Sequence, residues 1–312
     1  METALFQEQA EAVAAAFAGE PVTEVRQFAT GAQHFVFEAL FEARAPLVVR
    51  LSRPEDRRLA AAAVQLSRML RPLGVPLPEI FKAEIEAPIP FIVMERLPGA
   101  DLGEAIGDLQ AGEIEAIARG VAAAQAAAAR MGGASRFGFA VEPSEAPFDS
   151  WADFVAWHVE RSRKRLVTAA LFDPTYGRRV DALLARWRAA LEAAPATPFL
   201  HDTTTRNVIV AGGALSGIVD VDDLCFGDPR YVAALTRAAL IAMDRPTDYV
   251  AAWIRIAEWT PDPLFDLYTA AYLLDLMSEH GQPANGNERA STAEARRRLE
   301  REMERLLGPL EA

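Results

Sequence analysis

Hydrophobic and polar positions in the first third of the chain follow the short period of β-strands. In HFVFEALF (34–41) the phenylalanines recur on one face, as expected of a half-buried strand. PLVVRL (46–51) is a short apolar run with one charge, and two more strand-like runs separated by prolines lie within residues 75–99. We therefore expect residues 22–95 to be rich in β-structure.

One main helix interrupts these strands. Residues 54–74 begin with proline and acids and stop at Gly74, which is a typical helix signature. The N-terminal twenty residues carry acids within an apolar pattern, which predicts an amphipathic helix and lacks the basic start of a signal peptide. Beyond residue 101 helical patterns dominate, over 113–131, 150–166 and 177–194 and again from 229 to the end.

The character of the chain changes at RLPGADL (96–102), where we place the boundary between two lobes. The N-terminal lobe then comprises residues 1–97 and the C-terminal lobe residues 98–312. Within the second lobe, NVIVAGGALSGIVDV (207–221) consists of two apolar runs joined by Gly-Gly, which predicts a β-hairpin. The expected fold class is α+β, with a small β-rich lobe that contains one main helix and a larger α-helical lobe.

Composition and charge narrow the function. The net charge of −12 argues against a general nucleic-acid binder, which needs lysine and arginine to displace counterions. The sequence contains no run of about 18 apolar residues, so it predicts no membrane-spanning helix. Cys225 is the only cysteine, so no intramolecular disulfide forms and a reducing, cytoplasmic location is expected. The four histidines are scattered along the sequence, which argues against a histidine-based zinc site.

Four polar side chains flank the predicted hairpin. Asp202 and Asn207 come directly before its first strand, and Asp220 and Asp222 come at the end of its second. Because a hairpin brings these strand ends together, three carboxylates and a carboxamide should converge. Carboxylates so close repel one another unless a cation such as Mg²⁺ compensates them, and Mg²⁺ commonly binds together with substrate phosphates. An aspartate that does not bind the metal can deprotonate an attacking hydroxyl, as in kinases.

These motifs carry a resemblance to a known family. HDTTTRN followed by GIVDVDDLCFGDP resembles the aminoglycoside phosphotransferase and choline kinase-like family. Asp202 precedes Asn207 by five residues and Asp220 precedes Gly227 by seven, as in the usual form of the two motifs. The resemblance implies a bilobal protein-kinase-like fold, ATP and Mg²⁺ as cofactors, and transfer of the γ-phosphate to a hydroxyl of a small molecule. It also implies Asp202 as the catalytic base and Asn207, Asp220 and Asp222 as metal ligands.

The same resemblance implies an ATP site in the first lobe. VMERLPG would hold the adenine, with Glu95 and Leu97 as backbone contacts and Met94 lining the pocket. Gly31, in ATGAQHF, marks the loop over the nucleotide. Arg50 stands where relatives have a lysine that binds phosphate, and its guanidinium suits that role because it binds phosphate through two parallel hydrogen bonds.

One departure from the family raises a second interpretation. Residues 57–78 contain no acid to pair with Arg50, so that Glu55, Asp56 or Gln65 would have to substitute for the usual helix glutamate. A non-catalytic, nucleotide-binding pseudokinase is therefore the alternative to an active enzyme. A protein kinase is disfavoured, because no activation loop fits between VDVDD and GDP.

Neighbouring polar residues have less specific interpretations. His201 is expected to be a packed histidine, the threonines at 203–205 to shape the loop, and Asp223 to lie on the surface. Asp228, in the Gly-Asp-Pro motif, is expected to brace the catalytic loop, as the resemblance implies.

The acceptor is the least defined part of the prediction. Seven acids, two arginines and five tyrosines and tryptophans lie between residues 244 and 282. They suit a cationic amino-alcohol or aminoglycoside-like acceptor, but an acidic helical face with a packed aromatic side explains them equally well. The sequence does not identify the acceptor, the preference for ATP or GTP, or the oligomeric state.

Overall fold

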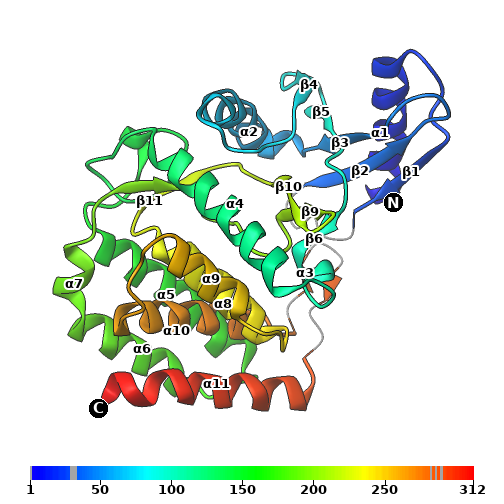
Figure 1. Cartoon of the computed structure of the whole chain (residues 1–312). Helices are drawn as coiled ribbons and strands as arrows, with labels where there is room; N and C mark the ends of the chain where they lie inside the picture. Colours follow the sequence, from blue (N-terminus) through cyan, green and yellow to red (C-terminus); the bar gives the residue numbers. More distant parts are fainter. Residues whose placement is uncertain (1, 29–33, 282, 285–286, 289–290) are drawn as a thin grey trace.

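The computed structural model describes residues 2–28, 34–281, 283–284, 287–288 and 291–312. It consists of a small lobe with a β-sheet, drawn at the top of Figure 1, and a larger helical lobe below it. The α+β, bilobal, kinase-like class expected from the sequence is confirmed. None of the helices in the described part of the chain has the length and apolar character needed to span a membrane.

The small lobe is built on a five-stranded antiparallel sheet in the order β1-β2-β3-β5-β4. Its strands are β1 (Glu24–Gln27), β2 (Phe35–Leu40), β3 (Leu47–Leu51), β4 (Ile80–Glu84) and β5 (Phe91–Glu95). Its helices are α1 (Glu2–Ala18) and α2 (Arg57–Leu70), and α2 is extended by single 3₁₀ turns on both sides and followed by Gly74 at φ +93°. These are the elements that the hydrophobic pattern predicts.

The two faces of this sheet have different partners. Alternate side chains of β3, namely Leu47, Val49 and Leu51, pack with β2 against α1. The other face turns towards the helical lobe, and there α2 packs against β4 and β5. Val48 and Arg50 of β3 are therefore left facing the space between the lobes.

The large lobe is mainly helical. Its helices are α3 (Leu102–Ala105), α4 (Ala111–Ala129), α5 (Trp151–Ala169), α6 (Thr175–Arg186), α7 (Arg188–Glu192), α8 (Arg230–Ala242), α9 (Asp248–Ile256), α10 (Pro263–Ser278) and α11 (Ala293–Glu311). The side chain of Ser150 caps α5 by accepting a hydrogen bond from the Asp153 N–H at 3.1 Å. The single helix expected over 177–194 is wrong, because the chain leaves helical geometry at Trp187 (φ −96°, ψ 7°) and forms α6 and α7.

Short strands between the helices carry the polar motifs. The predicted hairpin is present as β9 (Val208–Ala211) and β10 (Ala214–Ile218), joined by Gly212 and Gly213, which both have positive φ. It pairs with β6 (Ala100–Asp101). A second sheet has the order β7-β11-β8, from β7 (Gly138–Ala140), β11 (Leu224–Gly227) and β8 (Thr197–Phe199). A two-stranded ribbon pairs β12 (Pro283–Ala284) with β13 (Asn287–Glu288).

The two lobes share buried apolar residues behind the cleft. Leu66 and Leu70 of α2, with Val75 and Leu77 after it, pack against α4, β10 and β11 of the large lobe. The Ile218 N–H also donates to the Pro76 carbonyl at 2.8 Å. The position of the small lobe is thus fixed by a common core as well as by the single connection through residues 96–99.

Candidate active site

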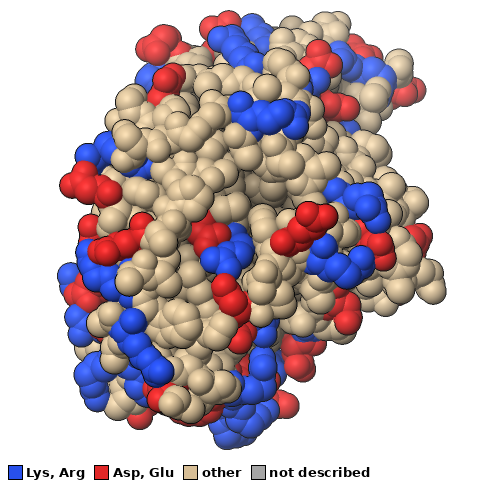
Figure 2. Space-filling model, turned by 60° about the vertical axis from the view of Figure 1, so that its left-hand side comes forward, with Lys and Arg blue, Asp and Glu red and all other residues tan. Residues whose placement is uncertain are grey.

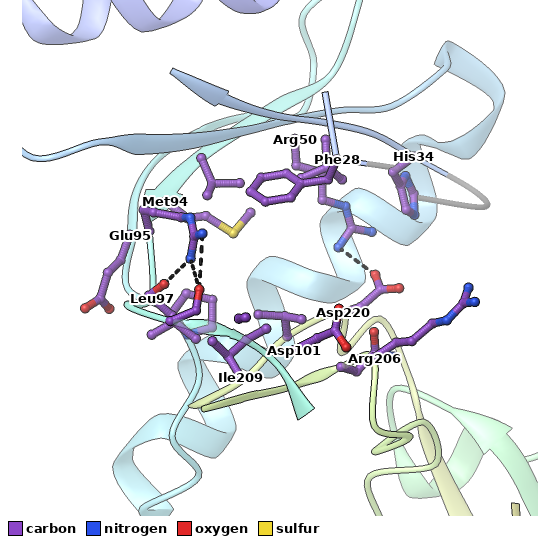
Figure 3. A pocket seen from close by; sticks show the side chains of 18 of the residues that line it. Phe28, His34, Arg50, Met94, Glu95, Leu97, Asp101, Arg206, Ile209 and Asp220 are labelled. Atoms are coloured by element: carbon purple, nitrogen blue, oxygen red, sulfur yellow. Dashed lines mark hydrogen bonds and ion pairs between the residues drawn. The ribbon is translucent and has the colours of Figure 1, made fainter. Parts of the chain in front are cut away.

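A cavity of about 340 Å³ separates the small sheet from the β6-β9-β10 hairpin sheet (Figure 3). This volume lies within the ordinary range for small-ligand sites. The cavity is lined by Phe28, His34, Val36, Val48, Arg50, Pro78, Met94, Glu95, Arg96, Leu97, Gly99, Ala100, Asp101, Glu104, Arg206, Asn207, Ile209, Val219 and Asp220. One end, near the inter-lobe connection, is mostly apolar, and the other end carries the charged motifs. This division fits a flat base at one end and phosphates at the other.

The apolar end is formed by the residues predicted to hold adenine. Met94 and Leu97 line the cavity from the inter-lobe connection, and Val48 lies opposite Met94 in the sheet. The Glu95 side chain points away from the cavity (Figure 3) and accepts a hydrogen bond from the Glu79 N–H at 3.0 Å. Only the backbone of Glu95 is therefore placed to meet a base, which is the contact expected from the sequence.

Arg96 closes the connection at this end. Its guanidinium hydrogen-bonds the carbonyls of Leu97 and Gly99, forms an ion pair with Glu38 at 2.8 Å and lies over the Phe28 ring at 5.5 Å. Gly99 has φ +100°, and a Cβ there would stand 1.9 Å from the Val210 carbonyl oxygen. Only glycine therefore lets the connection lie directly against β9.

The catalytic loop runs from His201 to Asn207, between β8 and β9. Asp202 accepts a hydrogen bond from the Thr204 hydroxyl at 3.0 Å, and its backbone carbonyl accepts one from the Asn207 side-chain amide, also at 3.0 Å. This second bond uses the nitrogen of Asn207 and leaves its side-chain oxygen for another partner. The structure thus brings Asp202 and Asn207 together, as the five-residue spacing suggests.

Two residues that the sequence analysis did not single out hold this loop from below. Buried Gln125 of α4 donates to the Leu200 carbonyl at 2.9 Å and to the Thr203 hydroxyl at 3.0 Å. Thr236 of α8 donates to the Thr203 carbonyl at 3.3 Å. Gln125 could have been noticed in the sequence, because it is a lone polar residue within the alanine run of α4. An amide on a buried helix face requires hydrogen-bond partners.

Asp220 lies at the floor of the charged end. Its backbone has φ +61°, a left-handed conformation that aspartate tolerates better than most residues and that strained sites often use. About half of its side chain is exposed (55%). Desolvation raises the pKa of the Asp220 carboxyl, Arg50 opposes this effect, and the carboxylates of Asp222 and Asp202 raise the pKa further. This crowding of acids is the arrangement that a cation would relieve.

Asp222 and Arg50 form an ion pair between the lobes. The Arg50 guanidinium is buried, donates to Asp222 Oδ2 and lies 3.6 Å from Asp220 Oδ1. His34 Nε2 also lies 3.0 Å from Asp222 Oδ2. Burial works to raise the pKa of Asp222, but Arg50, followed by His34, holds it well below its usual range. Asp222 is therefore a partly buried carboxylate, and one of its oxygens is already occupied.

The donor set is suitable for magnesium. Asp222 Oδ1 is buried and has no hydrogen-bond partner among the described residues, and the nearby Asp220 and Asn207 line the cavity. Among the described residues no group of three or more His, Cys, Asp or Glu side chains could hold a metal by itself. Mg²⁺ is compatible with so few protein ligands, because it usually completes its shell with waters and substrate phosphates.

The expected substitutes for the helix glutamate do not hold Arg50. Gln65 hydrogen-bonds Glu142 at 2.7 Å on the surface, and within the described part of the chain neither Glu55 nor Asp56 forms an ion pair with Arg50. Gly31, the other residue predicted to contact the nucleotide, lies outside the described residues.

Two sequence-based interpretations of nearby residues change, those of Asp223 and Asp228. Asp223 is half-buried and pairs with His201 Nδ1 at 2.8 Å, so the expectation of a surface aspartate is wrong. His201 is packed as expected, against Phe139. Burial alone would lower its pKa, but the Asp223 carboxylate more than offsets this effect and raises the pKa of His201 to about 9.

Asp228 accepts hydrogen bonds from the Arg230 guanidinium at 2.7 Å and the Tyr268 hydroxyl at 3.1 Å. Arg230 continues to Asp262 at 2.8 Å. Among the described residues, none of the hydrogen bonds or ion pairs of the Asp228 side chain reaches the catalytic loop. It braces α8 and α10, so the expected contact with the loop is wrong.

The acidic and aromatic residues of the 244–282 segment are used within the fold. Tyr249, Trp253, Tyr268 and Tyr272 are buried in the core. Four of the acids pair with arginines: Asp244 with Arg298, Asp262 with Arg230, Asp266 with Arg237 and Asp275 with Arg165. On the face in Figure 2, acidic and basic side chains likewise lie side by side. The packed helical face, the second of the two interpretations, is thus the one that the structure supports.

The fold and this site define a kinase-like phosphotransferase. The sequence profile of the phosphotransferase enzyme family, APH, matches residues 24–268, and the chain belongs to this family. The match confirms the resemblance drawn from the two aspartate motifs and the assignment as a small-molecule kinase. No curated protein sequence matches this chain.

Solved structures of aminoglycoside phosphotransferases have the same fold. A thermostable mutant of APH(4)-Ia in its apo form is 18% identical, with a TM-score of 0.66, and the match covers 96% of this chain and 98% of that one. A mutant of APH(4)-Ia in ternary complex with AMP-PNP and hygromycin B is 19% identical (TM-score 0.65, 96% and 97% covered). ADP-bound APH(2'')-Ib is 16% identical (TM-score 0.60, 96% of both chains covered). At these identities the likeness concerns the fold.

Proposed function

We propose that this protein transfers the γ-phosphate of ATP to a hydroxyl group of a small molecule, with Mg²⁺ as the metal. The observation that carries the proposal is the convergence of four polar groups: Asn207 and Asp220 line the charged end of the cavity, and the carboxylates of Asp202 and Asp222 lie close enough to raise the pKa of Asp220. Phosphoryl transfer depends mainly on positioning and on compensating charge, and both are provided by these groups. The nucleotide-bound relatives support the choice of cofactor.

Each residue has a distinct part in the proposed reaction. Asp202 is the base that accepts the proton of the acceptor hydroxyl, and Thr204 orients its carboxylate. Asn207, Asp220 and Asp222 would hold Mg²⁺, which neutralises charge on the phosphates when it is bound. Arg50 binds phosphate, and the backbone of Glu95 and Leu97 beside Met94 receives the base. Gly31 is proposed as part of the loop over the nucleotide.

The proposal also includes a division of labour and a location. Residues 1–97 would serve nucleotide binding, and residues 98–312 would supply the catalytic groups and the acceptor site. The single cysteine, Cys225, is buried, which fits a reducing cytoplasm. Since the acids of 244–282 are largely engaged by arginines, they give no reason to restrict the acceptor to cationic molecules.

Isothermal titration with ATP, with and without Mg²⁺, tests the proposal on the wild type and on Asp220→Ala. We expect Mg²⁺ to strengthen ATP binding at least tenfold in the wild type and to have little effect in the variant. Absence of ATP binding in every condition would refute the proposal. Mg²⁺-dependent binding without transfer to any amino-alcohol, sugar or aminoglycoside acceptor would favour the alternative of a pseudokinase.

A further inference from the structure

Arg50 is a buried cation on a central strand. Only 6% of its surface is exposed, and β3 pairs with β2 on one side and β5 on the other. A buried guanidinium needs a fixed counter-ion, since removing a charge from water is costly unless it is paired. The identity of that counter-ion decides what orients Arg50 towards a phosphate.

Helix α2 of the small lobe does not supply the counter-ion. The sequence of α2, RRLAAAAVQLSRML, contains no acid, and its apolar face packs on β4 and β5. The partner comes instead from the other lobe, where Asp222 accepts a hydrogen bond from the Arg50 guanidinium. The orientation of the Arg50 side chain therefore depends on how firmly Asp222 is held in place.

Asp222 is held in turn by a histidine. His34 precedes β2, is buried, and places Nε2 3.0 Å from Asp222 Oδ2 and Nδ1 3.1 Å from the Ser52 hydroxyl. With Nε2 protonated, the ring donates to Asp222 and accepts the Ser52 proton, so that both ring nitrogens are satisfied. Ser52 itself is buried directly after β3, two residues from Arg50. The hydrogen bonds thus lead from Arg50 on β3 to Asp222 in the large lobe, and from there through His34 back to Ser52 at the end of β3.

We propose that His34, with Ser52 behind it, is a positioning residue for Arg50 and acts through Asp222. This Ser52–His34–Asp222–Arg50 relay performs the function for which α2 offers no acid. The proposal rests on the proposed function, because it concerns the cation that meets the phosphates. It assigns to His34 an effect on nucleotide affinity that depends on the presence of Arg50.

A double-mutant cycle measured by isothermal titration with Mg²⁺ and ADP tests the relay. We expect His34→Ala to weaken ADP binding about tenfold, a coupling of ordinary size for residues in one network. His34→Gln places an amide N–H near the position of Nε2, and we expect it to restore binding to within about threefold of the wild type. In the Arg50→Met background, His34→Ala should add less than about a twofold loss.

The matched control uses two buried serines. Ser52→Ala should weaken ADP binding about threefold, whereas Ser67→Ala, on α2 and outside the relay, should leave it unchanged. Ser52→Ala and His34→Gln also keep the test decisive if His34→Ala does not fold, which its melting temperature will show.

The outcomes separate the relay from the proposed function. Equal losses from His34→Ala with and without Arg50 would overturn the relay, because His34 would then act on the nucleotide independently. No loss from His34→Ala would overturn it as well. Both outcomes leave the proposed function intact, since they presuppose ADP binding by the wild type. Failure of the wild-type protein to bind ADP would overturn the proposed function and the relay with it.

Discussion

The Gln125 side chain forms two hydrogen bonds with the backbone of Leu200. Its amide nitrogen donates to the Leu200 carbonyl and its oxygen accepts from the Leu200 N–H, each at 2.9 Å. The amide thereby acts as a strand partner for the residue just before the catalytic loop, and it reaches Thr203 inside the loop as well. The position of Asp202 is set from α4 by these contacts.

Replacement of Gln125 by alanine should therefore affect both stability and catalysis. The change leaves two backbone groups of Leu200 buried without partners, which should cost about 2–3 kcal/mol in the free energy of unfolding. The loop should shift, and kcat should fall about tenfold or more. Urea unfolding and steady-state kinetics measure the two effects. Gln65→Ala is the control, because Gln65 contacts Glu142 on the surface, and similar losses in both variants would contradict the prediction.

Asp202→Asn should separate binding from chemistry. The amide keeps the shape of the side chain and its contact with Thr204 but cannot accept the proton of the acceptor. We expect kcat to fall about 10²–10⁴-fold, with the dissociation constant for ATP within about threefold of the wild type. Titration calorimetry and an ATP-consumption assay give the two numbers. Retention of more than half of the wild-type kcat would exclude Asp202 as the base.

The His201–Asp223 pair should make stability depend on pH. The pKa of His201 is raised to about 9, from about 6.5 in an unfolded chain. Its contribution is therefore fully present below pH 6.5 or so and is lost as the pH rises through about 9. Between pH 6 and pH 9.5 we expect the wild type to lose about 1–2 kcal/mol more than His201→Asn. Urea unfolding at both pH values tests this, and parallel pH profiles would contradict it.

Asp228→Asn should weaken the fold while largely sparing the chemistry. The carboxylate binds Arg230 and Tyr268 and so joins α8 to α10. Loss of its charge in a buried position should lower the free energy of unfolding by about 2–4 kcal/mol. At a temperature where the variant is folded, kcat should stay within about threefold of the wild type. A fall of kcat comparable to that of Asp202→Asn would instead mean that Asp228 supports the catalytic loop.

The sequence predicted those features that depend on local patterns. Strands and helices of the small lobe follow the periodicity of their side chains, and the Gly212-Gly213 hairpin explains why two separate aspartate motifs meet. It could not predict the β7-β11-β8 sheet, since strands of three or four residues have too few positions to establish a period. Trp187 gives no local signal for the break between α6 and α7.

Long-range pairing was the other limit. The sequence offers partners for Arg50 only in and just before the helix that follows its strand, whereas the partner in the fold, Asp222, lies 172 residues away. His34 and Gln125 likewise gain their importance from groups that only the fold places beside them. The acids of 244–282 show the converse, because residues that looked like a ligand surface are occupied by arginines from other helices.

The shared apolar core behind the cleft bears on how this protein can be divided. Leu66, Leu70, Val75 and Leu77 belong to the nucleotide-binding half by sequence, yet they pack against the large lobe. A fragment that ended at residue 97 would expose these side chains to water. In the remaining fragment, the apolar residues of α4 and β11 that they cover would be exposed as well. The two halves are consequently a unit of folding, and a kinase of this construction cannot be shortened to its nucleotide-binding part.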